Sequence, residues 1–234
     1  MIICPNCLSS PILKDSKYCK SCNWSVLNKK GVLDYLNQND RDDQLAQDYS
    51  DNYENLAQIN LKRSNVDRRF LHNQAKNLMK YIGPVRNKKI CEIGVGQGFL
   101  CDELIKAGAS SVAAVDVAFS YLKRFTNHKV VTPYLANAEY LPFVDEFDLI
   151  ASTDVMEHVL NVGSYLYCVN RALIPNGLAA IRIPYREGLL TYSPHRGYPH
   201  KFGHLRSFNK DVLKIYFKQA GFKIEAMHLD GFLS

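Results

Sequence analysis

The sequence lacks the features that place a chain in a membrane or on a secretory route. No apolar run approaches the roughly 20 residues that a membrane-spanning helix requires. The opening segment, MIICPNCLSS, lacks the charged-then-apolar order of a signal peptide. The chain also contains neither an internal repeat nor a low-complexity segment. These absences predict a cytoplasmic protein that has no membrane as a partner.

The composition is that of an ordinary globular protein, with 47% hydrophobic and 22% charged residues. Its 234 residues suffice for one α/β domain, or for one such domain with a small appendage. A formal net charge of +6 permits an anionic partner without requiring one. None of these numbers fixes an oligomeric state.

The seven cysteines do not form a disulfide framework, because their number is odd and the chain has no export signal. Cys91, Cys101 and Cys168 are scattered among apolar neighbours and are expected to be small buried residues. The other four form two C-x-x-C pairs near the N-terminus and require a separate explanation.

The two pairs, Cys4 with Cys7 and Cys19 with Cys22, are typical of a Cys₄ metal site. Each C-x-x-C turn can place two thiolates on one ion, and a short hairpin between the turns closes a tetrahedral shell. No βαβ pattern surrounds the pairs, as a thioredoxin-like redox site would require. The segment therefore resembles a zinc ribbon over residues 1–37, with structural zinc as the expected metal and iron as the chemical competitor.

The rest of the chain begins with helices and then alternates between strands and helices. Two amphipathic helices, 38–58 and 68–83, fill a helical linker that spans residues 38–84. Strands are expected at 88–94, 111–118, 130–138, 147–155, 178–185 and 222–229, and helices at 99–108, 120–127, 162–177 and 209–221. This order predicts a doubly wound, mainly parallel α/β sheet over residues 85–234, with ligands bound beyond the carboxyl ends of its strands.

The stretch CEIGVGQGF contains a glycine-rich turn made by Gly94, Gly96 and Gly98. Its spacing departs from the dinucleotide fingerprint G-x-G-x-x-G, and it lacks the G-K-[S/T] ending of a P-loop. No basic side chain lies in the turn, whereas the acidic residue Glu92 lies just before it. The turn therefore favours a nucleoside derivative that carries positive charge and no phosphate, and S-adenosylmethionine has both properties.

With this turn and four further motifs in order, the chain resembles the class I S-adenosylmethionine-dependent methyltransferases from about residue 45 to its end. The motifs are EIGVGQGF, AVDVA, ANAEYLPF, DLIASTDVMEHV and RALIPNGLAAIRIPY. The resemblance implies that Glu92 and the glycines surround the methionine part and that Asp116 binds both ribose hydroxyls. Where the family usually has Asp in the adenine-contacting turn, this chain has Asn137.

The resemblance also implies the remaining cofactor contacts. The full predicted set is Glu92, Gly94, Gly96, Gly98, Asp116, Val117, Asn137, Ala138, Glu139 and Thr153, with Tyr49 and Tyr53 from a helix that covers the cofactor. The alternative role for the two tyrosines is core packing of an amphipathic helix.

The methyl acceptor is expected to enter beside residues 185–208, which follow the fifth strand of the methyltransferase pattern. Histidine can serve as a base near neutral pH, and this segment holds three. We expect His200 or His204, rather than His195, to be catalytic, although solvated loop histidines are a common alternative. His158, after the strand at 147–155, is a further candidate base or a packing residue.

These features predict O- or N-methylation of a small molecule, such as a sugar or glycan precursor. The alternative is methylation of an RNA base, with the ribbon holding the RNA, and a third possibility is a protein that binds the cofactor without catalysis. No Asp/Asn-Pro-Pro-Tyr follows the strand at 147–155, which disfavours methylation of the adenine amino group. No Pro-Cys loop is present for attack on pyrimidine C5.

Overall fold

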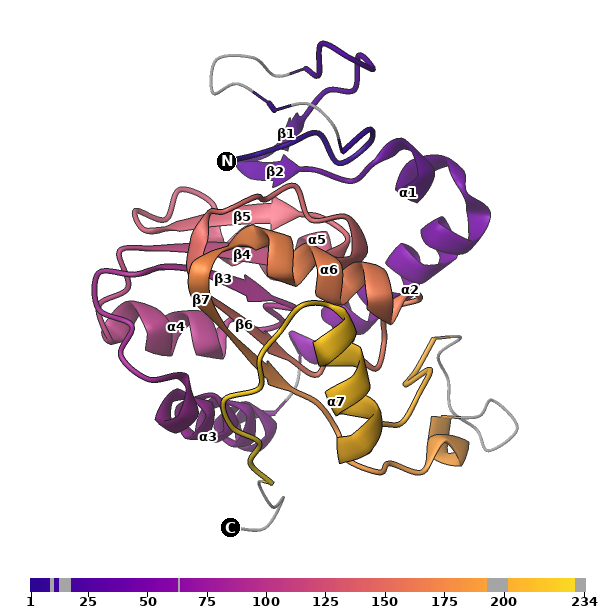
Figure 1. Cartoon of the computed structure of the whole chain (residues 1–234). Helices are drawn as coiled ribbons and strands as arrows, with labels where there is room; N and C mark the ends of the chain where they lie inside the picture. The colour runs from indigo at the N-terminus through magenta and orange to yellow at the C-terminus, as the bar shows by residue number, and fades with distance from the viewer. Residues whose placement is uncertain (9–10, 13–17, 63, 193–201, 230–234) are drawn as a thin grey trace.

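The computed structural model describes residues 1–8, 11–12, 18–62, 64–192 and 202–229. Within these residues a seven-stranded sheet with the strand order β1-β2-β5-β4-β3-β6-β7 forms the centre of the molecule (Figure 1). The strands are β1 (Leu27–Lys29), β2 (Val32–Asp34), β3 (Lys89–Ile93), β4 (Ser111–Asp116), β5 (Val131–Leu135), β6 (Phe147–Thr153) and β7 (Leu173–Arg182). All neighbouring strands run parallel except β1 and β2, which form an antiparallel pair. The predicted doubly wound, mainly parallel sheet is confirmed.

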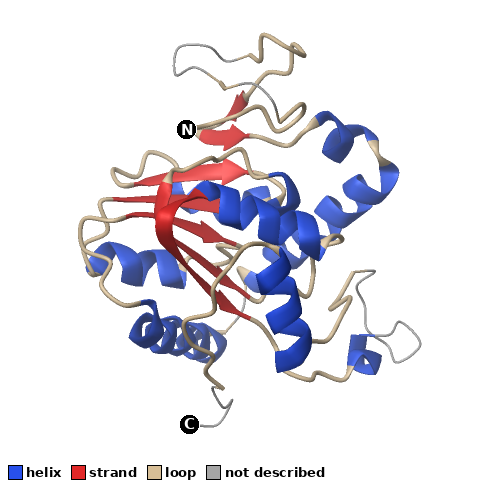
Figure 2. Ribbon diagram, in the orientation of Figure 1, coloured by secondary structure: helices blue, strands red, loops and turns tan. Residues whose placement is uncertain are grey.

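Helices cover both faces of this sheet (Figure 2). One buried cluster contains Ile90 of the central strand β3. The helices that pack in this cluster are α3 (Asn65–Ile82), α4 (Phe99–Lys106) and α5 (Phe119–Leu122). The neighbouring residue Cys91 lies in the other cluster, with α6 (Val162–Ala172) and α7 (Lys210–Gln219). Because successive side chains of a strand point to opposite faces, a strand buried on both faces reads as a continuous apolar run.

The N-terminal segment joins the sheet instead of standing apart from it. Strand β2 pairs in parallel with β5, so that Leu33 lies opposite Tyr134. Trp24 and Tyr35 are buried in the same cluster as the core residues of α6, and the indole Nε1 of Trp24 donates a hydrogen bond to the Leu36 carbonyl. The division of the chain into units 1–37, 38–84 and 85–234 stays a prediction. The contacts above connect the first of these units to the last.

The predicted helix 38–58 is two helices, α1 (Gln38–Asp42) and α2 (Gln44–Asn60). Asp43 separates them because its backbone is extended, and its carboxylate caps α2 by accepting from the Ala46 N–H. None of the helices in the described part of the chain is long and apolar enough to cross a membrane.

The predicted helix 162–177 is wrong in its last turn, because α6 ends at Ala172 and β7 begins at the next residue. Leu173 pairs with Phe147, but the next paired residues are Leu178 and Leu149. The intervening Ile-Pro-Asn-Gly segment bulges out of the ladder. Proline cannot donate a hydrogen bond to a neighbouring strand, and Asn176 has a left-handed backbone (φ 64°), so both favour a bulge over a helix.

The predicted strand 222–229 does not form; these residues make no strand pairing in the described structure. Phe222 and Met227 instead pack against the core cluster under α7, and His228 stacks on Tyr81 of α3 at 4.6 Å between ring centroids. Side-chain packing therefore holds this segment in place of ladder hydrogen bonds.

Candidate functional site

A cleft of about 390 Å³ lies beyond the carboxyl ends of β3, β4, β6 and β7. This is where a doubly wound sheet binds its ligands. Most residues that the sequence predicts to contact a cofactor line it: Glu92, Gly94, Gly96, Gly98, Asp116, Val117, Asn137, Ala138, Thr153, Tyr49 and Tyr53. His158 lines the cleft at its other end.

The turn after β3 forms the floor of the cleft, and three of its residues have positive φ. Gly94, Gly96 and Gly98 have φ values of 74°, 50° and 80°. The N–H groups of Gly94 and Val95 donate to the Val115 carbonyl of β4 at 2.9 and 3.3 Å, which fixes the turn against the neighbouring strand. The absence of side chains brings the backbone within reach of a ligand.

Replacing Gly94 with alanine is expected to lower both cofactor affinity and stability. A Cβ at this position would lie 2.3 Å from Cγ2 of Val155, whose branched side chain has few alternative rotamers. The left-handed backbone adds a cost of about 1–2 kcal/mol for a residue with a Cβ. Calorimetry with S-adenosylhomocysteine and thermal unfolding would measure both losses.

Gly188→Ala is the matched control for Gly94→Ala, because no heavy atom lies within 4 Å of its added Cβ. We expect this control to keep the affinity and unfolding temperature of the parent chain. A Gly94→Ala variant that also kept both would contradict the close approach of the turn to Val155.

Glu92 presents a buried carboxylate to the cleft. The residue is 2% exposed, and its Oε2 atom has no hydrogen-bond partner among the described residues. Burial raises the pKa of this carboxyl group to about 8. A cationic group in the cleft would provide the missing partner, so the arrangement suits the ammonium group of S-adenosylmethionine.

Asp116 ends β4, and both of its carboxylate oxygens are held by the backbone. The Gly96 N–H donates to Oδ2 at 3.1 Å, and the Ala118 N–H donates to Oδ1 at 2.8 Å. Burial raises the pKa of this carboxyl group to about 6. Each oxygen keeps a second lone pair, so the fixed carboxylate can still accept hydrogen bonds from a diol.

The turn after β5 departs from the prediction at one residue. Asn137 and Ala138 line the cleft, but the carboxylate of Glu139 accepts hydrogen bonds from the Leu160 and Asn161 N–H groups at 2.7 and 2.9 Å. The Glu139 side chain therefore fixes the loop before α6, in place of the predicted contact with the cofactor.

Asn137 links the cleft to the N-terminal segment. Its Nδ2 donates to Oδ1 of Asp40 at 2.8 Å, and Asp40 forms a capping box with Asn37 at the start of α1. The side chain of Asn137 also accepts from the Glu139 N–H. The position of the turn after β5 is thus tied to a helix that follows the cysteine-rich segment.

Helix α2 brings Tyr49 and Tyr53 to the lining of the cleft, and their predicted contact with the cofactor stays a prediction. Their rings lie 4.6 Å apart, and the Tyr53 hydroxyl is 2.8 Å from Nδ1 of His158. The helix is held by Glu54, whose carboxylate accepts from the Ser120 N–H, and by the Asn60 carbonyl, which accepts from Gln97 in the glycine turn at 3.0 Å.

At the end of the cleft beside β6, two histidines meet a glutamate. The rings of His158 and His204 lie 4.5 Å apart and nearly perpendicular, and Nδ1 of His204 contacts the Glu187 carboxylate. Glu157 is 1% exposed, and burial raises its pKa to about 8. Burial, followed by the neighbouring His204, lowers the pKa of His158 to about 4. The predicted His200, like His195, lies outside the described residues.

Sequence reasoning missed several polar residues at this end. Arg182, at the end of β7, forms an ion pair with Asp154 and donates to Oε1 of Gln74 at 3.1 Å. Glu157 and Glu187 surround the histidines. A signal existed for the first two, since both lie where a parallel strand ends. Gln74 comes from a segment with no motif, and Glu187 lies in the predicted acceptor segment 185–208 without a local signal that distinguishes it.

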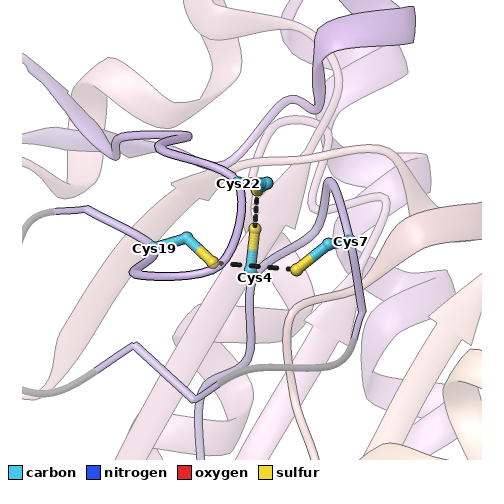
Figure 3. Close-up of side chains that lie close together, drawn as sticks. All are labelled: Cys4, Cys7, Cys19 and Cys22. Carbon is cyan, nitrogen blue, oxygen red and sulfur yellow. Dashed lines mark hydrogen bonds between the residues drawn. The ribbon is translucent and has the colours of Figure 1, made fainter.

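The four N-terminal cysteines gather in one cluster outside the cleft (Figure 3). Sγ of Cys4 is 3.6 Å from that of Cys22, and Sγ of Cys7 is 3.7 Å from that of Cys19. A tetrahedral zinc ion with bonds of about 2.3 Å holds its sulfur atoms about 3.8 Å apart. Asn23, after the second pair, has φ of 59°, as such a turn requires. The donor set and its spacing fit zinc.

Comparison with known proteins identifies relatives of this arrangement. The family model described as a methyltransferase domain matches residues 36–227. A ubiquinone biosynthesis O-methyltransferase of Bradyrhizobium diazoefficiens is 31% identical over 98 residues, which is 40% of this chain and 38% of that protein. The chain thus spans little more than a third of the length of this curated relative.

Two solved structures share the fold. One is a chain in the complex of the Haloferax volcanii Trm112 methyltransferase activator with a methyltransferase, with a TM-score of 0.61 and 17% identity over 74% of this chain and 75% of that one. The other is Haemonchus contortus phosphoethanolamine N-methyltransferase 2 in complex with S-adenosyl-L-methionine. Its TM-score is 0.52 and its identity 23%, over 64% of this chain and 36% of that one.

Proposed function

Since this chain belongs to the methyltransferase-domain family and is an S-adenosylmethionine-dependent methyltransferase, we propose that it methylates an oxygen atom of a small-molecule acceptor. The similarity to an O-methyltransferase supports oxygen over nitrogen. A hydroxyl group on a small aromatic compound or on a sugar is the acceptor class that we favour.

The charge at the acceptor end of the cleft carries this proposal. Among the described residues, Asp154 and Arg182 line this end as an ion pair, and the Glu187 carboxylate contacts His204 beside it. RNA binding depends on cations that neutralise phosphates, and carboxylates repel them. A neutral hydroxylated molecule fits this end better than an RNA strand.

The cofactor would bind along the floor of the cleft. Glu92 would receive the ammonium group, the Gly94–Gly98 turn would cradle the methionine part, and Asp116 would accept from both ribose hydroxyls. Tyr49 and Tyr53 would cover the bound molecule from α2. This placement is supported by the lining of the cleft and by the unpartnered oxygen of Glu92.

The methyl group would then point toward His158 and His204. We assign removal of the acceptor's hydroxyl proton to the Nε2 atoms of these imidazoles. The acceptor hydroxyl would pass its proton to an Nε2 atom of these imidazoles, its oxygen lone pair would form the new O–C bond, and the methyl–sulfur bond would break. The electron pair of that bond stays on sulfur, which becomes a neutral thioether. Alignment and exclusion of water supply much of the rate enhancement.

We also propose that Cys4, Cys7, Cys19 and Cys22 hold a structural zinc ion. Four protein ligands would fill its shell, so the ion would have no open position for a substrate. Its role would be to order the segment that leads into β1 and β2.

A screen with isotopically labelled S-adenosylmethionine tests the acceptor class. Pools of phenolic and sugar compounds are incubated alongside total RNA, and the products are identified by mass spectrometry. We expect the label in an ether of a small molecule. Label in an RNA base, retained in a salt-dependent manner, would instead establish the RNA alternative.

Once an acceptor is known, His204→Ala is expected to lower kcat by about 100- to 10,000-fold. Its affinity for S-adenosylhomocysteine should stay within about twofold of the parent value, because the cofactor is held by the other end of the cleft. His72→Ala is the matched control: this histidine also contacts a carboxylate, that of Glu103, but lies outside the cleft lining. Normal turnover by His204→Ala would remove the acceptor from this end of the cleft.

A further inference from the structure

Glu157, His158 and His204 form a second cluster of metal-ligating atoms, separate from the cysteines. One ligand atom from each lies within 4.8 Å of the others. Oε1 of Glu157 is 3.9 Å from Nε2 of His158 and 4.0 Å from Nε2 of His204. A tetrahedral ion with bonds of about 2.1 Å holds its ligand atoms about 3.4 Å apart. Each glutamate–imidazole distance is therefore about half an ångström longer than a tetrahedral shell requires.

The carboxylate of Glu157 provides an independent observation, because it is buried without a hydrogen bond. The residue is 1% exposed, and neither oxygen has a hydrogen-bond partner among the described residues. Burying an unpaired charge is costly, and coordination of a metal ion is one of the few ways to compensate it. The Nε2 atoms of two imidazoles lie about 4 Å from Oε1 of Glu157, and imidazole nitrogens are themselves ligands for divalent metals.

The Nδ1 atoms of both histidines are already engaged, which orients the rings. Nδ1 of His158 lies 3.1 Å from the Gly203 carbonyl, and Nδ1 of His204 contacts the Glu187 carboxylate. A proton on each Nδ1 would donate to these two acceptors and leave the lone pair of each ring on Nε2; the Tyr53 hydroxyl also lies 2.8 Å from Nδ1 of His158. Metal-binding histidines are held in this way, with the second nitrogen donating to a carboxylate or a carbonyl.

The chain also holds the two loops together at this point. Glu157 and His158 belong to the turn after β6, and His204 precedes α7. The Leu205 N–H donates to the Glu157 carbonyl at 2.9 Å, which fixes the second loop against the first. The cluster therefore rests on a backbone contact between the two loops.

We propose that Glu157, His158 and His204 bind a divalent transition-metal ion whose open positions face the cofactor cleft. Two imidazoles and one carboxylate suit Zn²⁺, Fe²⁺, Mn²⁺ or Co²⁺. His158 lines the cleft next to Asp154 and Val159, so the ion shares this space with the methyl donor.

Metal binding itself does not depend on the proposed function. Only the identity of the group that the metal activates, a hydroxyl of the acceptor, rests on that proposal. When that oxygen binds the ion, its proton is released to water at neutral pH, and the oxygen then attacks the methyl carbon as described above. With the metal bound, the two Nε2 atoms are its ligands, and water takes the proton that a free imidazole would otherwise accept.

Mn²⁺ is the probe for the test, because it prefers nitrogen and oxygen ligands and does not compete for the four thiolates. The full chain, with its cysteines loaded with zinc, is titrated with Mn²⁺, and electron paramagnetic resonance measures the free ion. We expect one Mn²⁺ to bind per chain. Glu157→Gln, which keeps the shape of the side chain, should weaken this binding by about 10- to 100-fold or more.

His204→Gln removes a ligand from the other loop and should weaken Mn²⁺ binding to a similar degree. His72→Gln should leave Mn²⁺ binding unchanged, because its contact with Glu103 lies outside the cluster. S-adenosylhomocysteine binding by calorimetry verifies that each variant is folded. Absence of Mn²⁺ binding by the parent chain at concentrations up to about 1 mM, or equal binding by the parent and Glu157→Gln, overturns the proposal. Neither readout uses an acceptor, so failure here leaves the proposed O-methylation standing.

Discussion

Replacing Asp116 with alanine is expected to weaken S-adenosylmethionine binding by about 100- to 1,000-fold. The carboxylate would accept hydrogen bonds from both ribose hydroxyls, and a hydrogen bond to a charged group contributes about 1.5–3 kcal/mol. Losing two such bonds at about 1.5–2 kcal/mol each weakens binding by about 3–4 kcal/mol. This energy corresponds to a loss of affinity of about 150- to 900-fold. Isothermal calorimetry with S-adenosylmethionine and S-adenosylhomocysteine measures the change.

The pH dependence of cofactor affinity in the parent chain provides a second test of the role of Asp116. Burial raises the pKa of Asp116 to about 6 in the absence of cofactor. Below that pH the group is protonated and must lose its proton to accept from both hydroxyls, so affinity should fall as the pH decreases through 6. Asp116→Ala should lose the change near pH 6 and keep only the dependence that Glu92, with a pKa of about 8, contributes.

Asp211→Ala is the control for a lost aspartate, since the side chain of Asp211 is 91% exposed and remote from the cleft. Its cofactor affinity should match that of the parent chain. An Asp116→Ala variant with parent-like affinity, or tight binding of NAD or ATP with no response to S-adenosylmethionine, would contradict the assigned cofactor site.

Replacing Cys19 with serine is expected to release zinc and to unfold the N-terminal segment. Structural zinc contributes about 10–16 kcal/mol of binding free energy in small metal-dependent modules, and the two cysteine turns have few apolar residues of their own, although Trp24 and β2 pack against the sheet. Elemental analysis should find one zinc fewer per chain than in the parent protein. The single tryptophan, Trp24, is 6% exposed in the same buried cluster and should shift its fluorescence to longer wavelength on exposure.

The loss should also reach the cofactor cleft, although more weakly. Strand β2 pairs with β5, and Asp40 receives the hydrogen bond from Asn137 in the cleft. We expect a several-fold loss of cofactor affinity, on the order of the 0.5–1.5 kcal/mol that one hydrogen bond contributes.

Cys168→Ser is the matched control for Cys19→Ser. Cys168 is also buried, and its thiol donates to the Glu139 carbonyl at 3.2 Å, a bond that a serine hydroxyl can replace. This variant should keep its zinc and its tryptophan spectrum. A parent protein that contains no metal and four free thiols at the cysteine cluster would overturn the zinc proposal.

The sequence alone determined the features that depend on local spacing. The alternation of strands and helices from residue 88 is visible because buried parallel strands are short continuous apolar runs and helices end at glycine or proline. Gly94, Gly96 and Gly98 have positive φ because such a turn requires it, and Asp116 ends a strand next to them. The two C-x-x-C pairs predicted their own convergence, since each pair is a single turn.

The tertiary structure alone decided what depends on contacts between distant segments. Strand β2 lies against β5, although about a hundred residues separate them in the sequence. The backbone of β2 pairs with the exposed edge of β5 only once the sheet has formed, and no motif relates the two segments. Residues 222–229 have an apolar pattern suited to a strand, yet they pack as a coil against α3 and α7.

The same reason separates the cysteine cluster, which the sequence predicted, from the second metal cluster, which the structure revealed. The cysteines lie within one short segment, so their spacing revealed them. Glu157 and His204 are 47 residues apart in the sequence, and nothing local relates them. The strand order placed the end of β6 beside the loop before α7, and the hydrogen bond from Leu205 to the Glu157 carbonyl set the two histidines around one carboxylate.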